Sequence, residues 1–195
     1  MRLEINAKAP NFNALNQNGE NIALCDFKGK FVVLYFYPKD MTKGCTIEAN
    51  DFSALCAEFR ALNAVILGVS PDNANSHQKF IAKENLSISL LCDENHKIAE
   101  SYGAWGLKKN YGKEYEGIIR STFIIKDGVI LKPLYNVKAT NHAQKVLESL
   151  KNLANPSANP SPNPATNRAN PSANLTANRA NPSANPKATK ANPKK

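Results

Sequence analysis

The run FVVLYFY, residues 31–37, constrains the fold more than any other part of the chain. An unbroken apolar run rich in β-branched and aromatic residues is typical of a strand that is covered on both faces of a sheet. Pro38 ends the run, because proline cannot donate a hydrogen bond to a neighbouring strand. The strand therefore predicts a layered α/β domain with cover on both sides.

A helix and a second buried strand follow this strand. Residues 45–62 carry apolar residues at helical spacing that are expected to face the core, whereas charged residues such as Glu48 are expected to face water. The expected apolar stripe consists of Ile47, Phe52, Leu55, Phe59 and Leu62. AVILGVS, residues 64–70, is the second strand. Because crossovers between parallel strands are right-handed, the three segments predict a parallel βαβ unit, with chemistry at the carboxyl ends of its strands.

The remaining patterns complete one α/β domain over residues 1–153. They predict an N-terminal hairpin over 12–27, helices over 73–84, 94–103 and 140–153, a short strand over 89–92, and a second hairpin over 121–135. The second hairpin turns at Asp127-Gly128, a strong hairpin signal. The fold class that follows is a central mixed sheet with flanking helices.

The C-terminal segment, residues 154–195, has a different composition. It holds eight of the twelve prolines, no aromatic residue, and the sequence RANPSAN twice. Such a segment cannot bury enough apolar surface to offset its ordering entropy, so we expect a disordered Asn/Pro/Ala-rich tail. The tail also carries six of the 25 Lys and Arg residues and none of the 16 acidic residues. The remaining domain is close to neutral, which argues against nucleic-acid binding.

The cysteines and histidines limit the possible chemistry further. The N-terminus does not resemble a signal peptide, and no apolar run approaches the ~20 residues of a membrane span. We therefore expect a cytoplasmic protein without membrane contact. In that compartment its four cysteines are expected to stay reduced. None of them has CxxC or zinc-finger spacing, which leaves no expected metal or cofactor. Cys92 and His96 alone are too few ligands for a metal. His77, His96 and His142 fall on expected helices and are interpreted as surface residues.

Cys45 lies where the helix after the first strand begins. Unpaired N–H groups and the positive end of the helix dipole favour a thiolate over a thiol at such a position. Gly44 allows close backbone approach, and the Thr42 hydroxyl can accept a hydrogen bond from the thiol or donate one to an oxygen beside it.

The segment YFYPKDMTKGCTIEANDF resembles the active-site segment of the peroxiredoxins. The signature of that family is Pro-x-x-x-Thr-x-x-Cys, and Pro38, Thr42 and Cys45 match its spacing. Two further segments, LLCDENHKIAESYGAWG and RSTFIIKDG, resemble the bacterioferritin comigratory protein subgroup of the family. The similarity extends over about residues 3–152 and leaves out the tail.

The resemblance implies a thioredoxin-like fold and a thiol-dependent peroxidase without a cofactor. Its substrates would be hydrogen peroxide and organic hydroperoxides, and thioredoxin or another thiol would reduce the cysteine sulfenic acid that forms. Cys45 would be the nucleophile, Thr42 and Arg120 would bind the peroxide oxygens, and Pro38 and Gly44 would line the substrate pocket. A monomer or weak dimer is expected. A peroxide sensor and a thioredoxin-like disulfide reductase are the alternative functions.

The thiol that resolves the sulfenic acid stays open at the level of sequence. In many members of the subgroup it follows the nucleophile by five residues, and here that position is Asn50. Cys25 is expected to be buried near the rim of the sheet opposite to Cys45. Cys56 lies too far along the helix from Cys45 to form a disulfide with it. Cys92, at the same edge of the sheet as Cys45, and an external thiol remain as the alternatives for the resolving thiol. The role of Glu48 is equally open, because it could pair with Arg120 or simply favour the first turn of the helix.

Overall fold

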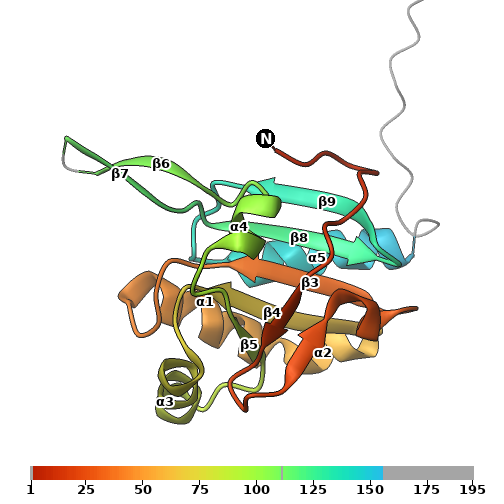
Figure 1. Cartoon of the computed structure of the whole chain (residues 1–195). Helices are drawn as coiled ribbons and strands as arrows, with labels where there is room; N and C mark the ends of the chain where they lie inside the picture. The colour runs from red at the N-terminus through yellow and green to blue at the C-terminus, as the bar shows by residue number, and fades with distance from the viewer. Residues whose placement is uncertain (1, 111, 156–195) are drawn as a thin grey trace, which may run out of the picture. The chain divides into compact units, whose positions relative to one another are not determined.

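The strand that the first apolar run forms is the centre of a five-stranded mixed sheet. In the computed structural model, which describes residues 2–110 and 112–155, this strand is β3 (Phe31–Phe36), and the sheet order is β5-β4-β3-β8-β9 (Figure 1). The other strands are β4 (Ala64–Ser70), β5 (Ser89–Cys92), β8 (Ser121–Lys126) and β9 (Val129–Tyr135). The expected tail lies outside the described residues, except for Ala154 and Asn155.

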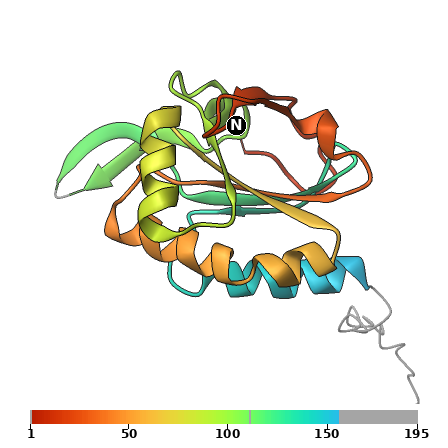
Figure 2. The same cartoon turned by 90° about the horizontal axis from the view of Figure 1, so that it is seen from below.

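Both faces of the sheet are covered, as the run predicted. Helices α1 (Lys43–Ala54), α2 (Cys56–Ala61) and α5 (His142–Ala154) lie along one face (Figure 2). The N-terminal segment and the short helix α4 (Lys97–Ser101) lie over the other. The side chains of β3 therefore divide between two cores. Val33 and Tyr35 pack toward the helices, whereas Leu34 and Phe36 pack toward the N-terminal segment.

The predicted connections are confirmed. β3 pairs in parallel with β4 and antiparallel with β8, so strand ends near Pro38 and the start of β8 lie on the same rim. The N-terminal hairpin consists of β1 (Asn13–Leu15) and β2 (Asn21–Ala23), followed by the 3₁₀ turn η1 (Leu24–Phe27). Helix α3 (Ala74–Glu84) follows β4. No helix in the described part of the chain is long and apolar enough to cross a membrane.

The expected single helix over 45–62 is two helices. The expected inward stripe is confirmed at Phe52, Leu55, Phe59 and Leu62, but it is wrong at Ile47, and Glu48 does not face water. Leu55, with φ −91° and ψ 4°, separates α1 from α2. Ile47 is 36% exposed, whereas Glu48 is fully buried. The face that packs on the sheet runs through Cys45, Ala49 and Phe52, which follow one another at helical spacing. Glu48 is therefore drawn toward the core beside them.

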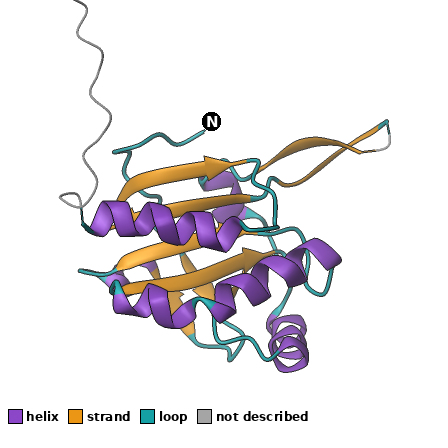
Figure 3. Ribbon diagram, turned by 180° about the vertical axis from the view of Figure 1, so that it is seen from behind, coloured by secondary structure: helices purple, strands orange, loops and turns teal. Residues whose placement is uncertain are grey.

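The hairpin of β6 (Trp105–Asn110) and β7 (Lys113–Ile118) was not predicted from the sequence. These strands pair with each other as a separate two-stranded sheet. They project from the domain near the edge of the central sheet where β3 ends and β8 begins (Figure 3). Their outer part exposes Leu107 and Tyr115, so no buried face imposes a regular apolar alternation on the sequence. The pattern that sequence analysis depends on is therefore absent.

Gly68 in β4 is required by close packing, and alanine is expected to destabilise the fold. A Cβ atom there would lie 2.6 Å from the Tyr35 hydroxyl oxygen and 2.7 Å from Cδ2 of Leu90, and both side chains are fully buried. Gly68→Ala should lower the free energy of unfolding by about 1–3 kcal/mol in urea denaturation. Gly106→Ala is the control, because its Cβ would meet Ile119 at an ordinary 3.4 Å. Equal stabilities of the two variants would contradict the packing argument.

Candidate active site

Cys45 lies in the first turn of α1, at the carboxyl rim of the sheet. Thr42 is the N-cap residue of this helix, and the side chain of Cys45 is 1% exposed. The first backbone hydrogen bond of the helix runs from the N–H of Thr46 to the carbonyl of Thr42, so the N–H of Cys45 precedes the intrahelical ladder. The expected location of the thiol at a helix entrance is confirmed.

Arg120 brings a guanidinium to this thiol from the neighbouring strand, at the same rim of the sheet. It directly precedes β8, whose first residue, Ser121, pairs with Phe36 at the end of β3. Its Nη2 donates to the Cys45 Sγ at 3.2 Å, while its Nη1 donates to a carboxylate oxygen of Glu48. Burial disfavours the charged guanidinium, but Glu48 and Cys45 more than offset it, and the pKa of Arg120 is raised.

The sequence alone allowed two roles for Glu48, and the structure shows the one in which Glu48 pairs with Arg120. Its carboxylate is fully buried, and Oε1 has no hydrogen-bond partner among the described residues. Burial raises the pKa of Glu48 to about 7, although Arg120 acts in the opposite direction. A signal was available in the sequence, because Glu48 follows Cys45 by one helical turn and so shares its face.

The raised pKa of Glu48 makes a testable contribution to stability. Because the folded state holds this proton more tightly than the unfolded state, Glu48 favours folding below about pH 4.5, and this contribution is lost as the pH rises through about 7. Glu48→Gln keeps the shape and one acceptor oxygen without the titration. Relative to the wild type, this variant should gain on the order of 2 kcal/mol between pH 5 and pH 8 in urea denaturation. A difference that does not vary with pH would contradict the assignment.

Thr42 and Pro38 lie on the loop that leads into α1. The Thr42 hydroxyl donates to the carbonyl oxygen of Lys39 at 3.1 Å and does not cap the helix, so the side chain stands exposed at the rim. Gly44 lies against Arg120, and a Cβ there would be an ordinary 3.6 Å from Nη2. Sterics therefore leave room for a methyl group, and the close approach expected at Gly44 is not a strict requirement.

A hollow of about 540 Å³ opens beside Arg120 and Pro38. The β6–β7 hairpin contributes Leu107, Lys108 and Lys109 to it, and Ile119 and Val137 add apolar surface. Lys108 donates to the carbonyl oxygen of Ile118. Burial, followed by the charge of Arg120, lowers the pKa of Lys108, whereas Cys45 raises it. This wall of the hollow was not predicted, because the β6–β7 hairpin that carries it was not predicted.

Cys92 ends β5, two strands away from β3 on the same rim, as expected. Its side chain is half-buried. Burial, and after it the carboxylates of Glu94, Asp40 and Asp72, raise the pKa of Cys92 to about 11. In this conformation Cys92 is therefore a protonated thiol at neutral pH, a weak nucleophile.

Two expectations for the other cysteines and the histidines were wrong. Cys25 is exposed, because η1 turns it outward at the opposite end of the sheet. His77 is fully buried and bonds Asp40 at 2.9 Å, and His142 is buried with its Nε2 2.7 Å from the Thr122 hydroxyl. Burial lowers the pKa of His142 to about 4. Cys56 is buried, and its thiol lies 3.5 Å from the carbonyl oxygen of Ser87.

The buried thiol of Cys45 contacts a guanidinium at the entrance of a helix, on a thioredoxin-like sheet. This arrangement is typical of a thiol-dependent oxidoreductase. Comparison with known proteins shows to which family of such enzymes the chain belongs. Residues 5–132 match the model of the AhpC/TSA family. A putative peroxiredoxin of Helicobacter pylori is 59% identical over 150 residues, covering 76% of this chain and 99% of that protein. The peroxiredoxin Bcp of Bacillus subtilis is 50% identical over 155 residues, covering 79% of this chain and 99% of that protein.

Solved structures agree with these relatives. The Xanthomonas campestris bacterioferritin comigratory protein, whose structures were studied for alkyl peroxide reduction, superimposes with a TM-score of 0.70 at 38% identity. The match covers 73% of this chain and 92% of that protein. The chain belongs to the AhpC/TSA family of peroxiredoxins. It is a thiol-dependent peroxidase with a thioredoxin-like fold, as the sequence resemblance implied.

Proposed function

We propose that the protein reduces hydrogen peroxide and organic hydroperoxides through a sulfenic acid on Cys45. The observation that carries this proposal is the 3.2 Å contact between Nη2 of Arg120 and the Cys45 sulfur. The thiolate attacks the terminal oxygen of the peroxide, so that an S–O bond forms while the O–O bond breaks. The departing oxygen leaves as an alkoxide or hydroxide and takes up a proton, giving an alcohol or water.

Ionising the thiol supplies only part of the required acceleration. Complete conversion of an ordinary thiol to thiolate at pH 7 raises its reactive fraction about 30-fold, or ~2 kcal/mol. Enzymes commonly lower barriers by at least ~8 kcal/mol. The larger share must come from alignment of the O–O bond with the sulfur and from donors that meet the growing negative charge.

The residues around the sulfur are suited to supply that share. Arg120 offers a charged donor that Glu48 holds in place through the second nitrogen of the fork. The N–H of Cys45 precedes the helical ladder and can donate to a bound oxygen. The Thr42 hydroxyl stands at the rim and can exchange its bond to Lys39 for one to the peroxide. Pro38 and the adjoining hollow accommodate the substituent of an organic hydroperoxide.

The sulfenic acid must then meet a thiol. We propose two routes for this step, an internal one through Cys92 and an external one through thioredoxin or another thiol. The internal route requires movement, because Cys92 lies two strands away and is held as a protonated thiol. Peptide mapping by mass spectrometry under non-reducing conditions, after one equivalent of peroxide, separates the routes. A linkage between Cys45 and Cys92 supports the internal route, and its absence supports the external one.

Turnover with a reducing system tests the function as a whole. Such a cycle needs a compartment rich in reduced thiols, and we place it in the cytoplasm. The purified full chain should consume hydrogen peroxide and an organic hydroperoxide catalytically with thioredoxin, thioredoxin reductase and NADPH. If the protein consumes only one equivalent of peroxide and does not turn over, whether thioredoxin or a small dithiol is the reductant, the proposed cycle is overturned and a peroxide sensor is favoured.

A further inference from the structure

The proposed reaction requires a proton for the oxygen that leaves the peroxide. When the thiolate of Cys45 takes the terminal oxygen of an alkyl hydroperoxide, the other oxygen departs as an alkoxide. The conjugate acid of an alkoxide has a pKa near that of water, about 16, so a proton delivered during departure lowers the barrier. Because such a displacement proceeds in line, the departing oxygen lies on the far side of the attacked oxygen from the sulfur. Its proton donor is therefore to be sought in the hollow beside Arg120 and Pro38.

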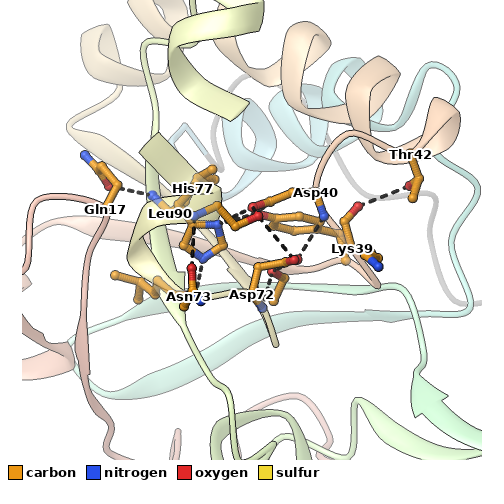
Figure 4. A network of polar contacts seen from close by, with 12 residues as sticks. Gln17, Lys39, Asp40, Thr42, Asp72, Asn73, His77 and Leu90 are labelled. Atoms are coloured by element: carbon orange, nitrogen blue, oxygen red, sulfur yellow. Dashed lines mark hydrogen bonds and ion pairs between the residues drawn. The ribbon is translucent and has the colours of Figure 1, made fainter. Parts of the chain in front are cut away.

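The guanidinium and hydroxyl groups at this rim are poor proton donors. Arg2 and Arg120 line the hollow, but a guanidinium stays protonated in proteins and does not give up its proton. The Thr42 hydroxyl is a weak acid, and it donates its hydrogen to the carbonyl oxygen of Lys39 (Figure 4). These groups can stabilise the negative charge of a departing oxygen, but they do not remove it.

His77, the histidine of the polar network in Figure 4, is also unsuited to this role. It is fully buried, with Nδ1 2.9 Å from a carboxylate oxygen of Asp40 and Nε2 3.2 Å from the carbonyl oxygen of Leu91. Both ring nitrogens thus have partners within the fold. Among the described residues that line the hollow there is no histidine and no carboxylic acid. The acids that remain there are the ammonium groups of two lysines.

Lys108 brings one of these ammonium groups into the hollow from β6. Its Nζ donates to the carbonyl oxygen of Ile118 at 2.8 Å, two residues before Arg120 in the chain. The half-buried side chain thus folds back toward the start of β8, and the centre of the Tyr115 ring lies 6.0 Å from Nζ. An ammonium has three hydrogens, and within the described part of the chain this one bond is all that Lys108 makes. Two hydrogens are therefore left for a substrate oxygen.

The surroundings of Lys108 favour the release of a proton. Burial, followed by the charge of Arg120, lowers the pKa of this ammonium, whereas Cys45 acts in the opposite direction. Lys108 thus interacts electrostatically with both members of the proposed site. Lys109, the other lysine of the hollow, is exposed, and adjacent residues of a strand point to opposite faces of the hairpin. Lys108 is therefore the better placed of the two.

We propose that Lys108 is a general acid in the reduction of organic hydroperoxides and donates the proton that turns the departing alkoxide into an alcohol. The S–O bond forms as the O–O bond breaks, and the departing oxygen takes a proton from Nζ, which leaves a neutral amine. Once reduction has returned Cys45 to a thiol, the amine takes up the thiol proton and restores the pair of thiolate and ammonium. This inference rests on the proposed function of Cys45 and adds a catalytic residue to it.

The test compares two oxidants that differ in their need for a proton. Cumene hydroperoxide releases an alkoxide, whereas meta-chloroperoxybenzoic acid releases a carboxylate, whose conjugate acid has a pKa of only about 4. The full-length protein is mixed with each oxidant, and oxidation of the peptide that contains Cys45 is followed by rapid quenching and mass spectrometry. Lys108→Met removes the acid, and Lys108→Arg keeps the charge without a proton to release. Lys138→Met is the matched control, because Lys138 is exposed and lies outside the hollow.

Both Lys108 variants should be oxidised about a hundredfold more slowly than the wild type by cumene hydroperoxide, but within about threefold of it by the peracid. Lys138→Met should stay within about twofold with either oxidant. The peracid also reports whether the site is intact, because that reaction needs the thiolate and not the proton. The contrast between the two oxidants is therefore the signature of a proton donor.

Several outcomes would overturn the assignment of Lys108. These are no loss of rate, an equal loss with both oxidants, and full recovery in Lys108→Arg, since charge alone would then suffice. A loss selective for cumene hydroperoxide in Lys109→Met, and not in Lys108→Met, would move the donor to Lys109. If wild-type Cys45 reacts with neither oxidant, the proposed function fails and the proton donor with it. If the wild type reacts but the variants do not discriminate, the assignment of Lys108 alone fails.

Discussion

Cys45→Ser is expected to abolish peroxide consumption, with a loss of at least about a thousandfold. Serine keeps the size of the side chain, but its hydroxyl is not ionised at neutral pH, so the nucleophile disappears while the site around it persists. The buried position, 1% exposed, tolerates this exchange because the replacement adds no volume. The measurement is the initial rate of peroxide consumption with thioredoxin, thioredoxin reductase and NADPH, together with the free energy of unfolding.

Cys25→Ser is the matched control for this prediction. Cys25 is exposed at the other end of the sheet, in a hollow lined by Phe27 and Asp127, so its loss should leave the rate within about twofold of the wild type. Activity that survives in Cys45→Ser but is lost in Cys25→Ser would move the chemistry to the opposite rim. That result would refute the assigned site.

Arg120→Met should lower kcat/KM by about a hundredfold or more, because the peroxide oxygens lose their charged donor. Methionine retains much of the apolar stem without the guanidinium. The variant should also lose stability, since Glu48 would be left as a buried acid without its cation. The stability loss should be smaller at pH 5 than at pH 8, because burial already raises the pKa of Glu48 and protonation removes its charge.

A double variant separates the two effects of Arg120. Glu48→Gln combined with Arg120→Met removes both charges, so much of the lost stability should return while kcat/KM stays low. Arg120→Lys tests the geometry, because a single ammonium cannot reproduce the fork that contacts Glu48 and Cys45 through separate nitrogens. If the double variant recovers activity along with stability, Arg120 serves the fold and not the chemistry.

The parts of the structure that sequence reasoning predicted are those where burial imposes a pattern. β3 is covered on both faces, and its unbroken apolar run could be assigned with its neighbours β4 and β8. The place of Cys45 followed from the end of that strand and the start of the helix. Arg120 followed from the family resemblance together with strand direction, which puts the start of β8 on the rim where β3 ends.

The parts that were missed depend on particular partners. His77 lies one helical turn before Phe80 and shares its inward face, but its contacts with Asp40, Tyr37 and the carbonyl oxygen of Leu91 explain why a histidine is tolerated there. Glu48 is buried because Arg120, far away in sequence, compensates its charge. The β6–β7 hairpin has no core face to give it a pattern. Long-range pairing of polar groups leaves little trace in a single sequence.

The distance along the chain between the thiol and its guanidinium has a consequence for protein synthesis. Cys45 and Arg120 are 75 residues apart, so a ribosome adding 5–20 residues per second needs roughly 4–15 s after Cys45 before it has made Arg120. During that interval the nascent chain carries the proposed nucleophile without the cation that will neighbour it or the strands β8 and β9 that will complete its sheet. Each newly made molecule thus passes through a stage in which its thiol meets cellular oxidants without the machinery that controls them.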